Sequence, residues 1–199
     1  PVLDDERLLE RLGELLGEIR RAGEDCGAFV RRMLEFSRVS CFDSKPTSMR
    51  PLIEDTVLMF RQAEDRHHPV DVRLPEEPVV LMVDPILIRH ALFNLLQNAA
   101  QAAGDDSPIV ITLEAAVEPN GTAVGWTLAV SDRGAGIPTD VLEKIFIPFF
   151  TTRSDGTGLG LPVVQHVVLL HGGHVSATSE PGDGTRFALW LPMNQSQAA

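Results

Sequence analysis

The chain has 199 residues, of which 44% are hydrophobic, and it carries a formal net charge of −11 at pH 7. This length suits one domain of ordinary size with an added element, and the hydrophobic fraction suffices for a packed core. The negative charge disfavours nonspecific binding to nucleic acid or to anionic membranes, because both attract clustered Lys and Arg.

The first forty residues carry the heptad repeat of a coiled-coil seam. Apolar side chains recur at alternating steps of four and three, and charged side chains occupy the other faces. A helix of this kind is not stable alone in water, so we expect residues 1–43 to join a dimerisation bundle. An amphipathic helix packed back on its own domain is the alternative. The seam consists of Leu8, Leu12, Leu15, Ile19, Ala22, Cys26, Phe29, Met33 and Phe36.

The remaining chain predicts an α/β domain over residues 44–193, which begins with a polar linker over residues 44–51 and is followed by a disordered tail over residues 194–199. Helices and strands alternate without a regular βαβ rhythm. We therefore expect a two-layer α/β sandwich, in which helices cover one face of a mixed sheet. The predicted helices span residues 52–65, 85–103 and 162–170, and the predicted strands span residues 70–74, 79–83, 109–117, 126–130, 174–179 and 185–191. A Pro-Asn-Gly sequence at 119–121 signals a hairpin.

The helix after Pro85 carries the first candidate functional residues. Asn94 and Asn98 lie four apart, so both carboxamides project from one helix face. They stand in the apolar sequence NLLQNAAQA, where an unsatisfied amide costs about 1–3 kcal/mol. The pair therefore needs polar partners, which are either a hard cation or ligand, or nearby backbone groups.

Two glycine-rich segments follow along the chain. The sequence DRGAG at residues 132–136 comes directly after a predicted strand. Its glycines permit close approach to a flat ligand, and Asp132 offers an acceptor to an exocyclic amine. The sequence GTGLGL at residues 156–161 opens a helix, where backbone amides and the positive end of the helix dipole favour phosphate. A plain turn and a plain glycine-rich loop are the alternatives for each segment taken alone.

Two other nucleotide-binding motifs do not fit. Lys45 and Lys144 are the only lysines, and neither follows the spacing of a P-loop, which excludes that motif. The glycines of GTGLGL are spaced GxGxG after a polar loop, whereas a dinucleotide-binding turn uses a different spacing after a strand.

The order of these motifs resembles the catalytic domain of bacterial sensor histidine kinases. The asparagines, DRGAG, three phenylalanines, GTGLGL and GDGTRF follow one another in that family's arrangement over about residues 52–192. The sequences PFFTT and NAAQA look most like the nitrogen-regulation type. The resemblance implies a Bergerat-type ATP-binding fold and transfer of the γ-phosphate of Mg-ATP to a histidine. The first helix resembles the second helix of the family's bundle, so the acceptor histidine would lie upstream of Pro1.

The resemblance also implies roles for single residues. Asn98 would ligate Mg²⁺ with help from Asn94, and Asp132 would hold the adenine amine and share a water with Thr185. Arg153 is the best-placed cation for the γ-phosphate, so Asn94 and Arg153 are the expected catalytic residues. The expected ATP-binding residues are Asn94, Asn98, Asp132, Gly134, Gly136, Ile137, Thr151, Thr152, Arg153, Gly156, Thr157, Gly158, Leu159, Gly160, Leu161 and Thr185.

A mobile lid over the nucleotide would span residues 141–155, fastened to the domain by Phe146, Phe149 and Phe150. Gln101 departs from the family pattern, because many relatives place lysine at that position. None of the six histidines stands in the context of the family's acceptor, and each is expected to be a surface or packing residue.

The resemblance further implies a homodimer that signals to a response regulator. ATPases of the same fold place a glutamate where this chain has Asn94, so efficient hydrolysis would lack its proton acceptor. The alternatives to a histidine kinase are such an ATPase, a serine kinase of the same fold, and a nucleotide-sensing module without transfer activity.

The setting of the chain is predicted from its cysteines and its apolar runs. Cys26 and Cys41 form no CxxC motif, so we expect both to be reduced in a cytoplasmic protein. No apolar stretch reaches the roughly 18–20 residues that span a bilayer, so we expect no membrane contact by these residues. The sequence starts at Pro1 without an initiator methionine, and we expect it to be part of a longer protein.

Overall fold

The computed structural model describes residues 11, 42–63, 68–104, 107–118, 121, 123–153 and 156–193. The chain divides into two units, Pro1–Ser40 and Cys41–Ala199, and all described residues except Arg11 belong to the second unit. The seam of the predicted dimerisation helix and the predicted tail therefore lie outside the described residues. Within the described ranges, no helix is long and apolar enough to cross a membrane.

A five-stranded mixed sheet forms the larger layer of the domain. Its strands, in order across the sheet, are β2 (Val70–Arg73), β4 (Ile109–Val117), β5 (Ala123–Asp132), β7 (Gly184–Pro192) and β6 (His174–Glu180). The pair β2–β4 is parallel, and the other three neighbouring pairs are antiparallel. This arrangement confirms the mixed sheet that the sequence predicts.

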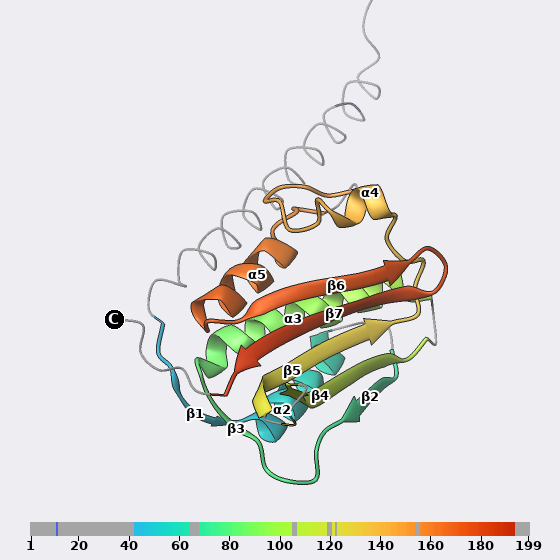
Figure 1. Cartoon of the computed structure of the whole chain (residues 1–199). Coiled ribbons are helices and arrows are strands. Elements are labelled where there is room, and N and C mark those ends of the chain that lie inside the picture. Colours follow the sequence, from blue (N-terminus) through green and yellow to red (C-terminus); the bar gives the residue numbers. More distant parts are fainter. Residues whose placement is uncertain are drawn as a thin grey trace, which may run out of the picture. The chain divides into compact units, whose positions relative to one another are not determined.

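Three helices form the second layer, which are α2 (Met49–Ala63), α3 (Pro85–Ala102) and α5 (Gly160–Leu170). Figure 1 shows α3 and α5 side by side on one face of the sheet. The helix α3 packs across β4, β5 and β7, α5 packs on β6 and β7, and α2 packs against α3. A short helix, α4 (Thr139–Leu142), was not predicted from the sequence.

The core lies between the sheet and these helices. Along β4, Ile109, Ile111 and Leu113 are buried, whereas Glu114, which belongs to the alternate set of side chains, is exposed. Because side chains alternate along a strand, one face of β4 meets the helices and the other remains open. The two-layer sandwich with helices on one face is thus confirmed.

The predicted polar linker is wrong in part, because it contains a strand. β1 (Lys45–Ser48) pairs antiparallel with β3 (Val80–Val83) in a separate two-stranded sheet. Lys45 and Pro46 have little strand propensity, and the partner strand of β1 comes from a distant part of the chain. β3 therefore does not join β2, its neighbour in sequence.

Several boundaries also differ from the prediction. α2 begins at Met49, three residues before the predicted start at 52, and the Met49 N–H donates to the Val79 carbonyl oxygen at 2.9 Å. Pro51 is tolerated there, since the first turn of a helix does not use its N–H groups. β5 is longer than predicted because β4 and β7 pair with it on both sides, which makes Asp132 the last residue of the strand. The expected hairpin turn at 119–121 lies largely outside the described residues.

Candidate functional site

The asparagine pair stands in the middle of α3, which a buried aspartate caps. The Asp84 Oδ1 accepts hydrogen bonds from the N–H groups of Ile86 and Leu87 at 2.9 and 3.1 Å. Asp84 satisfies two of the N–H groups that a helix leaves unpaired at its start, and Pro85 favours the first turn. The helix that carries the asparagines is therefore fixed firmly at its N-terminal end.

The two asparagines have different partners. The Asn94 Nδ2 donates to the His90 carbonyl oxygen at 3.0 Å. A nearby backbone group was one of the two kinds of partner that the sequence allowed. The Asn94 Oδ1 faces α5, since a Cβ on Gly160 would lie 3.4 Å from it. The half-buried Asn98 amide has no hydrogen bond within the described part of the chain. Asn94 thus presents its amide oxygen to the glycine-rich segment, and Asn98 lies one helical turn further along the same face of α3.

Asp132 is held at the end of β5 with its carboxylate already oriented. The side chain is buried, and its Oδ1 accepts a hydrogen bond from Gly134 N–H at 2.8 Å. Burial raises the pKa of Asp132 above its usual value, while hydrogen bonds from the backbone N–H groups of Gly134 and Thr185 oppose that rise. The carboxylate keeps further acceptor capacity for a ligand.

The glycines of the DRGAG segment are required by close backbone approaches. A Cβ on Gly134 would lie closer than 3.0 Å to the Ala102 carbonyl oxygen at the end of α3. Gly136 has a φ of 70°, and a Cβ there would lie closer than 3.0 Å to the Glu180 carbonyl oxygen. The segment is therefore clamped between α3 and the turn that follows β6, in addition to any role toward a ligand.

Sequence reasoning missed Ser179, which organises the same corner. Its Oγ accepts from Ile137 N–H at 2.8 Å, donates to the Gly184 carbonyl oxygen at 2.8 Å and lies 2.9 Å from Thr185 Oγ1. In the sheet, Ser179 is the direct partner of Thr185, and Thr185 is the partner of Asp132. The hairpin register around residues 181–184 was the signal that could have identified it.

The predicted lid, residues 141–155, lies against the glycine-rich segment. The Phe149 N–H donates to the Gly158 carbonyl oxygen at 2.9 Å, and both residues have positive φ angles, 67° and 65°. Phe149 is 55% exposed, whereas Phe146 and Phe150 are half-buried, and the fastening role of the three phenylalanines stays a prediction. Ile145, in the same segment, is buried. The lid turns sharply at Phe149, and this turn directs the side chain outward.

Arg153 joins the lid to the last turn of α3. Its Nη1 donates to the Gln101 Oε1, and its backbone N–H donates to Thr151 Oγ1 at 3.1 Å. Gln101 follows Asn98 by three residues, so the two amides share a helix face. Glutamine at this position can accept a hydrogen bond from the lid's guanidinium, which a lysine cannot do.

The structure thus places several of the predicted residues in two groups. One group consists of the α3 amides, the start of α5 at Gly160, and Arg153, and a second consists of Asp132 and Thr185 at the sheet. Within the described ranges, no group of three or more His, Cys, Asp and Glu side chains is placed to hold a metal. Amide oxygens still suit a hard cation that takes few protein ligands, as Mg²⁺ does. Residues 154 and 155 of the lid lie outside the described ranges.

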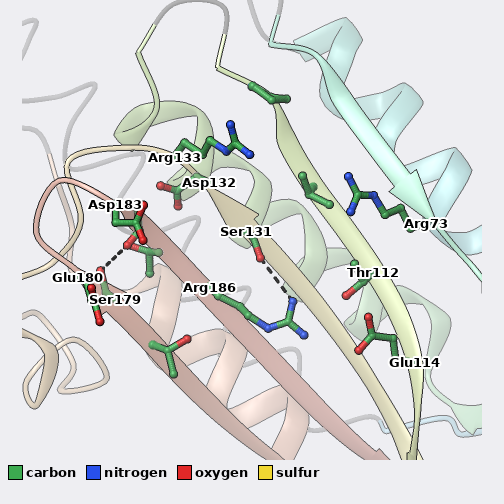
Figure 2. A pocket seen from close by; sticks show the side chains of 15 residues that line it. Arg73, Thr112, Glu114, Ser131, Asp132, Arg133, Ser179, Glu180, Asp183 and Arg186 are labelled. Carbon is green, nitrogen blue, oxygen red and sulfur yellow. Dashed lines mark hydrogen bonds between the residues drawn. The ribbon is translucent and has the colours of Figure 1, made fainter.

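A separate hollow of about 640 Å³ lies on the open face of the sheet. Figure 2 shows Thr112 and Glu114 of β4 facing Arg186 of β7, with Asp132 at one end of the group. Thr112 is buried, and its Oγ1 has no hydrogen-bond partner among the residues described. The described lining includes neither asparagine of α3, so this hollow is distinct from the group on the helix side.

Residues 83–195 match the family described as "Histidine kinase-, DNA gyrase B-, and HSP90-like ATPase". The chain is 41% identical over 166 residues to the sensor histidine kinase ZraS of Escherichia coli strain K12, a match that covers 83% of this chain and 34% of that protein. It is 34% identical over 181 residues to the C4-dicarboxylate transport sensor protein DctB of Rhizobium meliloti strain 1021, which covers 89% of this chain and 28% of that protein. The chain thus spans about a third of the length of these relatives.

A solved structure gives the same architecture. The nucleotide-free catalytic domain of the histidine kinase ThkA is similar to this chain with a TM-score of 0.66 and 28% sequence identity. The similarity covers 76% of this chain and 98% of that domain. The parts that agree therefore amount to one whole catalytic domain.

Proposed function

Because the chain belongs to the family of histidine kinase-, DNA gyrase B- and HSP90-like ATPases, we propose that it transfers the γ-phosphate of ATP to a protein histidine. Residues 44–193 would be the ATP-binding catalytic domain of a two-component histidine kinase. Residues 1–43 would add one helix to the dimerisation bundle, and the acceptor histidine would lie upstream of Pro1. The similarity to sensor histidine kinases over most of the chain supports this assignment.

The observation that carries the proposal is the Asn94 amide beside the glycine-rich segment. Asn94 faces Gly160 with an amide, where a hydrolysing enzyme of this fold needs a carboxylate. An amide cannot accept a proton near neutral pH, so an attacking water would not be activated. Transfer to an imidazole brought by another helix needs no such base on α3, and we therefore favour transfer over hydrolysis.

Adenine recognition is assigned to the sheet side of the site. One carboxylate oxygen of Asp132 is occupied by Gly134 N–H, which leaves the carboxylate able to accept from the exocyclic amine of adenine. Thr185, fixed by Ser179, stands beside Asp132 and would share a water with it. Gly136 and Ile137 would border the ring.

Phosphate binding is assigned to the helix side. The backbone amides of residues 156–161 at the start of α5 would hold the phosphates, as helix N-termini do for anions. The Asn98 amide oxygen would ligate Mg²⁺, assisted by Asn94. Bound Mg²⁺ would balance the negative charge of the phosphates. The side chains of Thr151, Thr152 and Thr157 would line the same region.

Arg153 would meet the γ-phosphate. Its guanidinium is always charged and can donate two parallel hydrogen bonds to phosphate oxygens. Gln101 keeps that guanidinium beside α3, close to the proposed metal ligand Asn98. The chain's part in the reaction is to position the phosphate and stabilise its charge while the imidazole nitrogen attacks the γ-phosphorus in line.

The partners follow from the same proposal. Two copies would associate through the seam of residues 8–36, and the phosphorylated protein would pass its phosphate to a response regulator. The chain would act in the cytoplasm, where ATP is available. ZraS and DctB are named as sensors, and we extend to this chain only the general role of a signalling kinase.

Transfer to a protein carrying the acceptor helix tests the proposal directly. With labelled ATP, the wild-type chain should produce a phosphate bond that is stable to base and labile in acid, as expected of phosphohistidine. Asn98→Ala should abolish labelling, whereas Gln97→Ala, on the same helix, should retain it. Phosphate release that outpaces protein labelling would instead favour the ATPase, and base-labile label would favour a serine kinase.

A binding measurement isolates the nucleotide step. Asp132→Asn should weaken ATP and ADP alike, because the amide can present a donor to the adenine amine instead of an acceptor. Equal calorimetric affinities for the wild type and Asp132→Asn would overturn the adenine assignment. ATP binding without any labelling of an acceptor would identify a nucleotide-sensing module.

A further inference from the structure

A buried aspartate and a buried histidine join the far ends of α3 and α5. The Asp84 N–H donates to His171 Nε2 at 2.9 Å, across 87 residues of sequence. The His171 Nδ1 lies 2.7 Å from the Val167 carbonyl oxygen, and the ring is fully buried. Since Nε2 accepts, Nδ1 carries the proton and donates to that carbonyl, so the ring is neutral.

The same pair holds the last two residues of the predicted dimerisation segment, residues 1–43. The Asp43 N–H donates to Asp84 Oδ2 at 3.0 Å. The Phe42 ring meets the His171 ring edge-on, with centroids 4.9 Å apart and an interplanar angle of 83°. We call Asp84 and His171 the clip, and Phe42 and Asp43 the linker start.

The clip lies at the opposite end of the two helices from the proposed nucleotide site. α3 runs from Asp84 to Asn94, whereas α5 runs from Gly160 beside Asn94 to His171 beside Asp84. The two helices therefore run antiparallel, with His171 bonded to the start of α3 and Gly160 facing its middle. Ten residues of helix separate Asp84 from Asn94, which is about 15 Å. The linker start thus rests on the common base of both helices that carry the proposed ATP site.

We propose that Asp84 and His171 are positioning residues for phosphoryl transfer, which seat the linker start on the base of α3 and α5. The inference rests on the proposed histidine-kinase function. Transfer requires the bound nucleotide to reach an acceptor on the dimerisation bundle, and the linker start is the covalent path between the two. A fixed linker start limits the orientations of the ATP site, and orientation of the reacting groups strongly affects rate. A released linker start turns the connection into a looser tether.

The structure offers two substitutions that release the linker start without removing the helix cap. Asp84→Asn keeps an oxygen for the N–H groups of Ile86 and Leu87, because asparagine caps helices as well as aspartate does. The asparagine amide nitrogen takes the position of Asp84 Oδ2. Because this nitrogen cannot accept a hydrogen bond, the bond from Asp43 N–H is lost. Phe42→Ala removes the ring contact from a side chain that is 39% exposed, so the fold should tolerate it.

The test compares ATP affinity and transfer rate in the full kinase that carries this chain and its acceptor helix. We expect Asp84→Asn and Phe42→Ala to lower kcat for histidine phosphorylation about tenfold, with KM for ATP within twofold of the wild type. Phe42→Tyr keeps the aromatic edge and should restore the rate. Leu58→Ala, which removes an exposed apolar side chain from α2, is the control and should leave both values unchanged.

The outcomes separate the two proposals. If the wild-type kinase transfers phosphate and both variants transfer at the wild-type rate, the positioning role is overturned. If the variants lose ATP affinity and transfer together, the clip only stabilises the domain, which also overturns it. A wild-type kinase that binds ATP but labels no histidine would contradict the proposed function itself.

Discussion

Gly134→Ala probes the close approach between the DRGAG segment and α3. A Cβ at this position would lie closer than 3.0 Å to the backbone carbonyl of Ala102 and 2.9 Å from Asp132 Oδ1. Helix backbone cannot move aside as the end of a flexible side chain can, so the segment itself has to shift outward. The shift withdraws Gly134 N–H from the Asp132 carboxylate, to which it donates at 2.8 Å.

The size of the effect follows from these two contacts. Forcing an extra carbon into a packed region costs about 1–3 kcal/mol of folding free energy. A hydrogen bond to a charged group contributes about 1.5–3 kcal/mol, and about 1.4 kcal/mol corresponds to a tenfold change in affinity. We therefore expect Gly134→Ala to unfold at a lower urea concentration and to bind ATP at least about tenfold more weakly.

Gly104→Ala is the matched control, because the same added carbon would meet nothing within 4 Å. Titration calorimetry with ATP and urea unfolding should leave this variant close to the wild type. If Gly134→Ala matches Gly104→Ala in both measurements, the segment is not constrained by α3. In that case the account of how Asp132 is held fails.

Three further predictions concern other parts of the chain. Burial lowers the pKa of His171, and this effect exceeds the opposing effects of the Val167 carbonyl and of Asp84. Below the unfolded pKa of about 6.5, the native state therefore binds fewer protons than the unfolded state. Stability should therefore be full above that pH and decline below it, and urea titrations of His171→Gln should lack this part of the decline. A chain that starts at Ser44 should be monomeric in light scattering, whereas the whole chain should self-associate, and equal monomeric masses would contradict the seam. Arg153→Ala should lower kcat for transfer by about tenfold or more and leave ADP affinity unchanged, because ADP lacks the γ-phosphate; a matching loss of ADP affinity would place the guanidinium elsewhere.

The parts of the site that the sequence predicts are those carried by local spacing. Asn94 and Asn98 share a face because of helix periodicity, and Asp132 ends a strand that its apolar residues mark. The sequence GTGLGL opens a helix because its glycines precede an apolar run, and α5 indeed starts at Gly160. These features depend on residues within one or two turns of each other.

The parts that the sequence does not predict depend on distant partners. The β1 strand exists because β3 pairs with it, and its own residues favour a loop. Ser179 accepts a hydrogen bond from Ile137, 42 residues away, and His171 accepts one from Asp84, 87 residues away. No local pattern encodes such pairs. For that reason the sequence predicts only a packing or surface role for His171, and its contact with the linker start is seen only in the structure.

The strand order β2-β4-β5-β7-β6 has a consequence for folding during synthesis on the ribosome. β7, which follows β6 along the chain, lies between β5 and β6, so β6 has no neighbour in the described sheet until residues 184–192 have been synthesised. Those residues also bring Thr185 to Asp132. A domain emerging from the ribosome folds as a unit once its strands are all available. A growing polypeptide therefore cannot complete the corner around Asp132, and any response to cellular ATP should begin only with the finished domain.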